Sequence, residues 1–174
     1  MITRRQFIKA GVLGGAALTA AGIFYSRGLK EAPGTAVPRG LTFGERTIIA
    51  ALVPAILAGA LPEPGEARSR AIAQTVDGVG VAVAGLSAAA QKELSELFAL
   101  LGFAPARVLL AGLWPGWEQA STAEIAAFLQ GWRDSRFALL RSAYAGLHDL
   151  VLGAWYGNPD TWAAIDYPGP PEML

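Results

Sequence analysis

The stretch FALLRSAYAGLHDLVLGAWY, residues 137–156, is the longest periodic segment of the chain and indicates its fold class. Apolar side chains recur in it about one helical turn apart, which is the spacing of one face of an α-helix. The other face carries small or polar residues, among them Arg141, His148 and Asp149. We expect a long amphipathic helix whose buried stripe consists of Phe137, Leu140, Tyr144, Leu147, Val151 and Ala154 or Trp155.

Start patterns place further helices upstream. Thr42 with Glu45, and Ser121 with Glu124, have the spacing of capping boxes, in which side chains and backbone amides at a helix start bond each other reciprocally. Ser87 and Pro105 also suit helix starts. The expected helices cover residues 42–60, 68–84 (or only to about 76, because two glycines follow), 87 to about 101, a short piece from 105, and 121–132.

The chain contains no credible strand pattern, internal repeat or coiled-coil heptad. Its 174 residues suffice for one ordinary domain once an export segment is set aside. The sequence therefore predicts an all-α protein, an irregular bundle of five or six helices after an N-terminal signal or anchor segment.

Composition points to a surface that is short of charge. Charged residues make up 16% of the chain, against about 25% in typical soluble domains, and apolar residues make up 53%. Such a surface tends to leave apolar patches that contact partners or membranes. Setting aside Arg4, Arg5 and Lys9 leaves 11 of the 14 basic residues against 14 acidic ones, so nucleic-acid binding is not expected.

The N-terminus has the pattern of an export signal. Thr3-Arg4-Arg5-Gln6-Phe7-Ile8-Lys9 precedes an uncharged run, residues 10–26, that is rich in glycine and alanine. This resembles a twin-arginine signal, whose pattern is Ser/Thr-Arg-Arg-x-Phe-Leu-Lys before a weakly apolar stretch. The candidate recognition residues are Thr3, Arg4, Arg5, Phe7, Ile8 and Lys9. We expect recognition by the twin-arginine translocase and transport, already folded, to the periplasm.

Three regions follow from this pattern: a signal segment over residues 1–26, a linker over 27–40, and a helical domain over 41–174 with an extended tail rich in aromatic residues and proline. The uncharged run of 17 residues lies at the lower edge of a membrane span, which needs about 20. Removal of the signal and its retention as an inner-membrane anchor both stay open.

The residue inventory offers little for catalysis. The chain has one histidine and no cysteine, so a zinc or iron site is not expected, and neither is a thiol nucleophile. His148 precedes Asp149, but adjacent helical residues point about 100° apart and do not orient one another. No nucleophile elbow and no dinucleotide fingerprint after a strand is present. We therefore expect a chain that is not itself an enzyme and binds no cofactor or metal.

Aromatic residues are concentrated late in the chain, where Trp and Tyr could form an interface because they combine large apolar area with a polar tip. Trp132 and Trp155 are expected in the core. For Tyr156, Trp162 and Tyr167, which lie in or beside non-helical backbone, core and interface both stay open. The candidate partner interface comprises Tyr156, Trp162, Ile165 and Tyr167.

The export pattern, the helix over 41–62, and the ending together resemble the gluconate 2-dehydrogenase subunit 3 family. The ending is Ala154-Trp155-Tyr156-Gly157-Asn158-Pro159, followed by Trp162, Ile165 and Tyr167-Pro168-Gly169-Pro170. These are small subunits of membrane-associated flavin dehydrogenases. The resemblance implies a large-subunit partner of the glucose-methanol-choline type that holds FAD and oxidises a sugar, sugar acid or other alcohol. It also implies a cytochrome c subunit that accepts the electrons.

Two other classes stay open. A stand-alone periplasmic helical protein would use its apolar faces to line a cavity for a ligand or lipid. An enzyme acting through His148, Asp149 or Arg141 is the least favoured class, because these residues form no recognisable catalytic arrangement.

Overall fold

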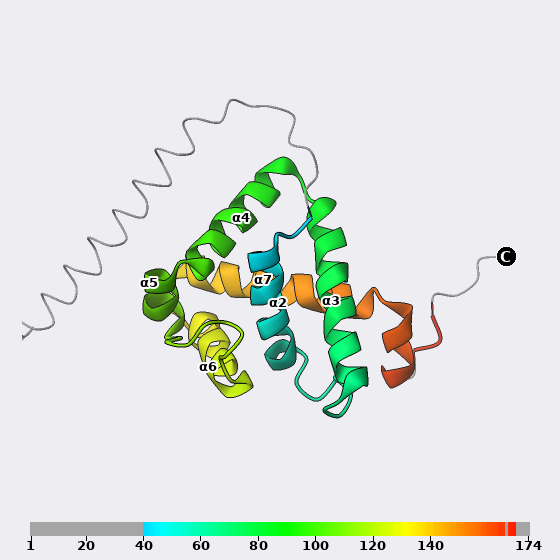
Figure 1. Ribbon diagram of the computed structural model, residues 1–174. Helices are drawn as coiled ribbons and strands as arrows, with labels where there is room; N and C mark the ends of the chain where they lie inside the picture. The colour runs from blue at the N-terminus through cyan, green and yellow to red at the C-terminus, as the bar shows by residue number, and fades with distance from the viewer. Residues whose placement is uncertain (1–39, 166, 170–174) are drawn as a thin grey trace, which may run out of the picture. The chain divides into compact units, whose positions relative to one another are not determined.

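The computed structural model describes residues 40–165 and 167–169, and this part of the chain is all-α, as predicted (Figure 1). Expectations for the signal segment and most of the linker lie outside these residues. The described part contains six α-helices, a π-helix and a 3-10 helix. Their bounds are α2 Phe43–Ile56, α3 Glu66–Ala84, α4 Ala88–Gly102, α5 Ala104–Ala106, η1 Arg107–Ala111, α6 Thr122–Arg133, α7 Ala138–Tyr156 and η2 Pro159–Ile165.

Helix α2 lies at the centre of the bundle and packs against α3, α4, α6 and α7 (Figure 1). Its side chains Ile49, Leu52 and Val53 are fully buried, as expected for a helix that is apolar on most of its faces. The helix ends at Ile56, earlier than the predicted residue 60, because Gly59 takes a left-handed turn with φ of 85°.

Helix α3 continues through its glycines to Ala84, so the longer of the two predicted bounds is correct. Gly78 faces Ala154 of α7, where an added Cβ would lie 3.1 Å from the Ala154 Cβ. The glycine therefore lets α3 and α7 approach closely, and this packing outweighs its low helix propensity.

Both predicted capping boxes are present. Thr42 accepts from the Glu45 amide while the Glu45 carboxylate accepts from the Thr42 amide at 2.7 Å, and Ser121 with Glu124 does the same at the start of α6. The stripe on α7 is confirmed for Leu147, Val151 and Trp155, all buried.

The expectation for Phe137 is wrong. It lies at the N-cap of α7, before the helix begins, and 56% of it is exposed. Because the helix starts one residue later than the periodic pattern, the stripe does not carry this ring into the core.

Candidate partner interface

The four predicted interface residues follow the C-terminal end of α7, where the chain turns back on itself. Gly157 closes the helix, its amide donating to the Gly153 carbonyl at 2.9 Å. The Asn158 Oδ1 then accepts from the Asp160 amide at 3.1 Å, a local turn that leads into η2. The buried Thr161 hydroxyl donates to the Trp155 carbonyl at 2.7 Å, so η2 is tied to a core residue.

Trp162 organises the residues around it. Its indole N–H donates to the Tyr156 carbonyl at 2.7 Å, one of the carbonyls that a helix end leaves without an intrahelical partner. Its ring meets that of Tyr167 edge to face, with centroids 5.2 Å apart. The Tyr167 amide donates back to the Trp162 carbonyl at 3.1 Å.

Gly169 completes this arrangement. It has a φ of 98°, and a Cβ there would lie 3.1 Å from Cζ3 of Trp162. The backbone therefore passes close to the indole ring, which a larger residue would prevent. We call Tyr156, Trp162, Tyr167 and Gly169 the tail cluster.

The tail cluster presents two tyrosines to solvent. Tyr156 is 46% and Tyr167 44% exposed, while Trp162, which contacts the Tyr167 ring and the Tyr156 carbonyl, is half-buried. The structure thus brings three of the four predicted residues together. Ile165 ends η2, and its side chain lies outside the described part of the chain.

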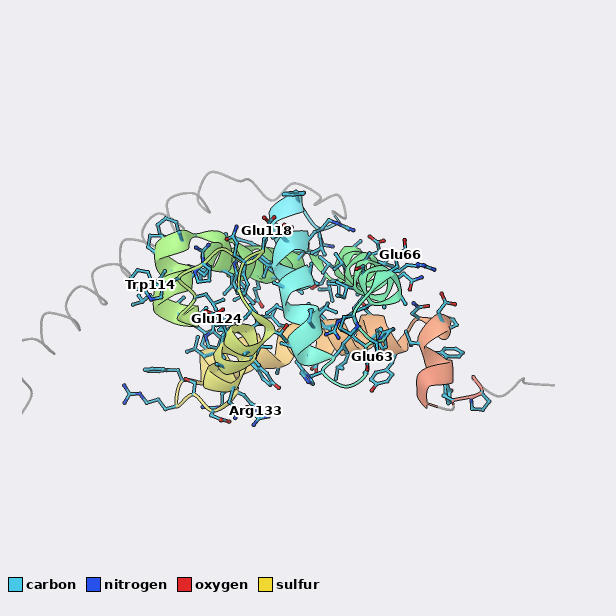
Figure 2. The ribbon with its side chains drawn as sticks, turned by 60° about the horizontal axis from the view of Figure 1, so that its bottom comes forward. Glu63, Glu66, Trp114, Glu118, Glu124 and Arg133 are labelled. Carbon is cyan, nitrogen blue, oxygen red and sulfur yellow. The ribbon has the colours of Figure 1, made fainter. Side chains whose placement is uncertain are left out.

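A second apolar region, not predicted from the sequence, lies at the other end of α7. Here α4 gives way to α5 and η1, a corner that Gly112 closes with a φ of 67°. Trp114 follows this corner and is 80% exposed (Figure 2). The Trp114-Pro115-Gly116 breaker was a usable indication, because a Trp placed there cannot belong to the buried stripe of a helix.

Two buried tryptophans donate hydrogen bonds to the backbone on either side of this corner. Trp117 Nε1 donates to the Leu101 carbonyl at 2.9 Å, and Trp132 Nε1 donates to the Leu110 carbonyl at 2.8 Å. Both rings pack edge to face against Phe128. The predicted core position of Trp132 is confirmed, as is that of Trp155.

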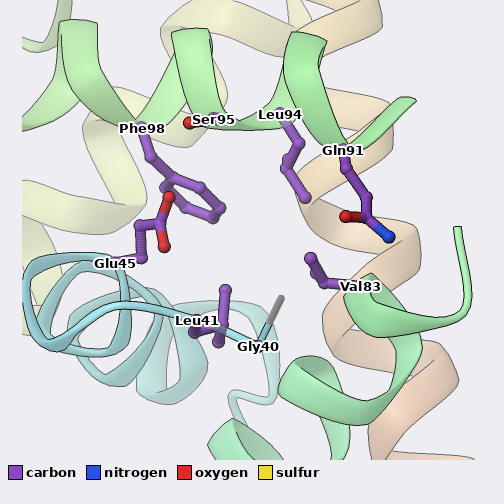
Figure 3. A pocket seen from close by; sticks show the side chains of 8 residues that line it. All are labelled: Gly40, Leu41, Glu45, Val83, Gln91, Leu94, Ser95 and Phe98. Carbon is purple, nitrogen blue, oxygen red and sulfur yellow. The ribbon is translucent and has the colours of Figure 1, made fainter. Parts of the chain in front are cut away.

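Two open grooves border α2 and α6. One, of about 560 Å³, lies between the first turn of α2 and the last turns of α4 and is lined by Phe43, Phe98 and Trp117 among others. The other, of about 440 Å³, lies between η1 and α6 and includes Leu110, Trp132 and Leu140. A third space, between α2 and α4, is too narrow for a water molecule. Figure 3 shows Glu45 directed into it beside Phe98 and Ser95.

The remaining candidate residues form no constellation in the described part of the chain. His148 Nδ1 and Asp149 Oδ1 are 3.8 Å apart, and His148 stacks on Tyr144 with centroids 5.4 Å apart. Arg141, near the start of the same helix, donates to the Ser135 carbonyl at 2.7 Å, and within the described residues no contact between it and His148 or Asp149 is found. No group of three or more His, Asp or Glu residues that could hold a metal ion occurs among residues 40–165 and 167–169.

By length and composition, no single helix of the described residues could cross a membrane. The combination of α4 with α5 and η1 passes the same test only as a pair bent by 82°.

Comparison with known proteins gives no match: no family model, curated protein or solved structure corresponds to this chain.

Proposed function

We propose that the protein is a non-catalytic accessory subunit of a periplasmic, membrane-associated flavin dehydrogenase. It would bring the flavoprotein through the twin-arginine pathway on its own signal and then remain bound to it. FAD would be held by the large subunit, and a cytochrome c subunit would accept the electrons. This chain would contribute no cofactor.

The observation that carries the proposal is the tail cluster. The family resemblance depends most on the ending of the chain, and Tyr156, Trp162, Tyr167 and Gly169 of that ending make up this cluster. An ordered aromatic surface suits a docking site, because little conformational entropy is lost when it binds. Tyrosine supplies apolar area and a hydrogen-bonding tip at such sites.

The test is purification of the tagged full-length chain from its native envelope. The expected result is co-purification of a larger subunit with stoichiometric flavin absorbance. Tyr156→Ala with Tyr167→Ala should weaken that association roughly 30-fold to 1,000-fold, the range for losing about 2–4 kcal/mol at a hot spot. Phe43→Ala with Val81→Ala is the matched control, since these side chains are 82% and 76% exposed on other helices.

Capture of no flavoprotein by the unsubstituted chain would overturn the proposed function. An equal loss of flavoprotein affinity in the tail and control variants would still support the partner, but it would show that the tail cluster is not the interface. Both tyrosine substitutions retain Trp162 and its hydrogen bond to the Tyr156 backbone, so the helical circular-dichroism spectrum should be preserved.

The export step has its own test. Arg4→Lys with Arg5→Lys should block translocation, because twin-arginine signals are recognised by their paired guanidinium groups. Cell fractionation should find both this chain and its flavoprotein in the cytoplasm. Normal periplasmic amounts of the substituted protein would refute the signal assignment.

A stand-alone ligand-binding protein is the second candidate, and the groove beside Phe43 favours it. Its volume of about 560 Å³ falls within the range of small-molecule sites, about 300–1,000 Å³. Native mass spectrometry of the envelope-purified chain separates the two: a retained small molecule without a protein partner supports this alternative.

A further inference from the structure

Exposed apolar side chains gather at one end of the described helical bundle. Eleven large apolar residues are exposed in the described part of the chain, and six of them lie in the segments 103–114 and 137–139. We call these six the apolar corner: Phe103, Leu109, Leu110, Trp114, Phe137 and Leu139.

The two segments are neighbours although they are distant in sequence. The Trp132 indole donates to the Leu110 carbonyl, so the end of α6 is fixed against η1. Leu110 and Leu140 line the same groove, which joins η1 to the first turn of α7. Figure 1 shows α5 and α6 at one end of the bundle, with η2 at the other.

Arginines accompany the apolar corner. Residues 103–114 and 133–141 contain Arg107, Arg133, Arg136 and Arg141 and one acid, Asp134. The rest of the described chain has four basic and ten acidic residues. One acidic residue, Glu124, lines the groove between η1 and α6, and its carboxylate is engaged in the capping box of α6 (Figure 2).

One arginine contacts the apolar corner directly. The Arg136 guanidinium lies 4.8 Å from the centroid of the Phe137 ring. Such a pair combines an apolar surface with a cation in the geometry that suits the boundary between lipid tails and headgroups.

From this composition we propose that the apolar corner rests on a bilayer surface that contains anionic lipid. Leucine, phenylalanine and tryptophan would enter the headgroup boundary while the arginines contact lipid phosphates. A lipid surface fits better than a protein, because half of the corner is leucine, which is under-represented at protein hot spots. The inference is independent of the proposed dehydrogenase partner and of the N-terminal segment.

The absence of cysteine allows a residue-level test on the full chain. Leu139→Cys and Leu109→Cys each accept one environment-sensitive fluorophore, and Val81→Cys is the control, since Val81 and Leu139 are 76% and 78% exposed. With vesicles of mixed phosphatidylcholine and phosphatidylglycerol, the two corner probes should shift to the blue and brighten several-fold. The Val81 probe should not change.

This design separates the apolar corner from an N-terminal anchor. If the N-terminal segment alone bound the vesicles, all three probes would remain in water and the proposal would be overturned. A response of the corner probes to the purified dehydrogenase subunit but not to vesicles would overturn it as well. So would the same response to inorganic phosphate without vesicles, which would indicate a simple anion site.

The charge contribution is tested with Arg133→Gln and Arg136→Gln together. An arginine near an anionic surface is worth about fivefold in affinity, so the pair should lower vesicle affinity by roughly 25-fold. Arg68→Gln with Arg70→Gln, on α3, is the control and should have no effect. Equal losses in both variants would show that net charge alone, rather than the apolar corner, determines binding.

Discussion

The two ends of α7 both carry exposed aromatic side chains, but they hold them in different ways. In the tail cluster, Trp162 contacts the ring of the exposed Tyr167 and donates a hydrogen bond to the carbonyl of Tyr156 at the end of the helix. In the apolar corner, the most exposed side chain is that of Trp114, whereas the buried Trp117 and Trp132 donate hydrogen bonds to backbone carbonyls of α4 and η1. The 19 residues of α7 separate the two by about 28 Å.

The difference shows which aromatic residues the fold depends on. At the corner, the buried Trp117 and Trp132 stabilise the fold, whereas Trp114 is exposed. The exposed side chain is therefore available for contact with a partner or surface and contributes little to stability. In the tail cluster, Trp162 provides support and part of the surface together. Substitutions should therefore separate binding from stability at the corner, whereas Trp162 links them.

The largest effect on stability is expected from substitution of Trp132, whose buried side chain packs beneath the apolar corner. Trp132 is 3% exposed, and Trp132→Ala should lower the free energy of unfolding by about 3–5 kcal/mol. Trp132→Phe retains most of the ring but removes the donor to the Leu110 carbonyl, and should cost about 1–3 kcal/mol. Urea denaturation followed by circular dichroism measures both.

Amide exchange locates the damage of the phenylalanine variant. The Gly112 amide, which donates to the Val108 carbonyl in η1, should exchange its hydrogen faster in this variant. The Gly157 amide at the tail should keep its protection from exchange. Loss of protection at both ends would mean that Trp132 supports the whole bundle rather than the corner.

The second prediction compares Trp162 of the tail cluster with Trp114 of the apolar corner. Trp162→Ala removes a hydrogen bond and an edge-to-face pair and should cost about 1.5–2.5 kcal/mol. Trp114→Ala should change stability by less than about 0.5 kcal/mol, as is usual for exposed side chains. Denaturation midpoints of the two variants provide the comparison, and equal costs would contradict the division between support and surface.

The sequence predicted what depends on local hydrogen bonds and on spacing. The capping boxes at Thr42 and Ser121 were recognisable because donor and acceptor lie three residues apart. The core positions of Trp132 and Trp155 were also predictable, since both lie on helices with a clear apolar face. Tyr156, Trp162 and Tyr167 could be grouped because they are close in the sequence.

The corner could not be predicted in this way. Its key hydrogen bond joins Trp132 to a carbonyl 22 residues earlier, and no local pattern indicates that pairing. The π-helix Arg107–Ala111 has no periodicity of its own that a sequence of five residues would reveal. Phe137 was misplaced because a helix boundary that is wrong by one residue turns a core position into an exposed one.

The smallest expected effect is on stability at low pH, and it should differ between the apolar corner and the tail cluster. The Ser121 backbone amide and the Ser121 hydroxyl donate to the Glu124 carboxylate at 2.8 and 2.7 Å. Both bonds lower the pKa of Glu124, and the bond from the backbone amide has the larger effect. A carboxyl whose pKa is lower in the folded state stabilises that state above its unfolded pKa, about 4.3. This contribution is lost as the pH falls through the lowered value.

Glu124→Gln should therefore reduce stability slightly at neutral pH, and the difference from the unsubstituted protein should shrink as the pH falls below about 4.3. Melting temperatures over a pH series measure it, with Glu118→Gln, a neighbouring glutamate outside the capping box, as the control. The Ile125 amide, which donates to Ser121 in the first turn of α6, should lose protection in acid before the Gly157 amide does. Simultaneous loss at both amides would show that acid acts on the bundle as a whole, and the capping box would then have no separate part in holding α6 against the corner.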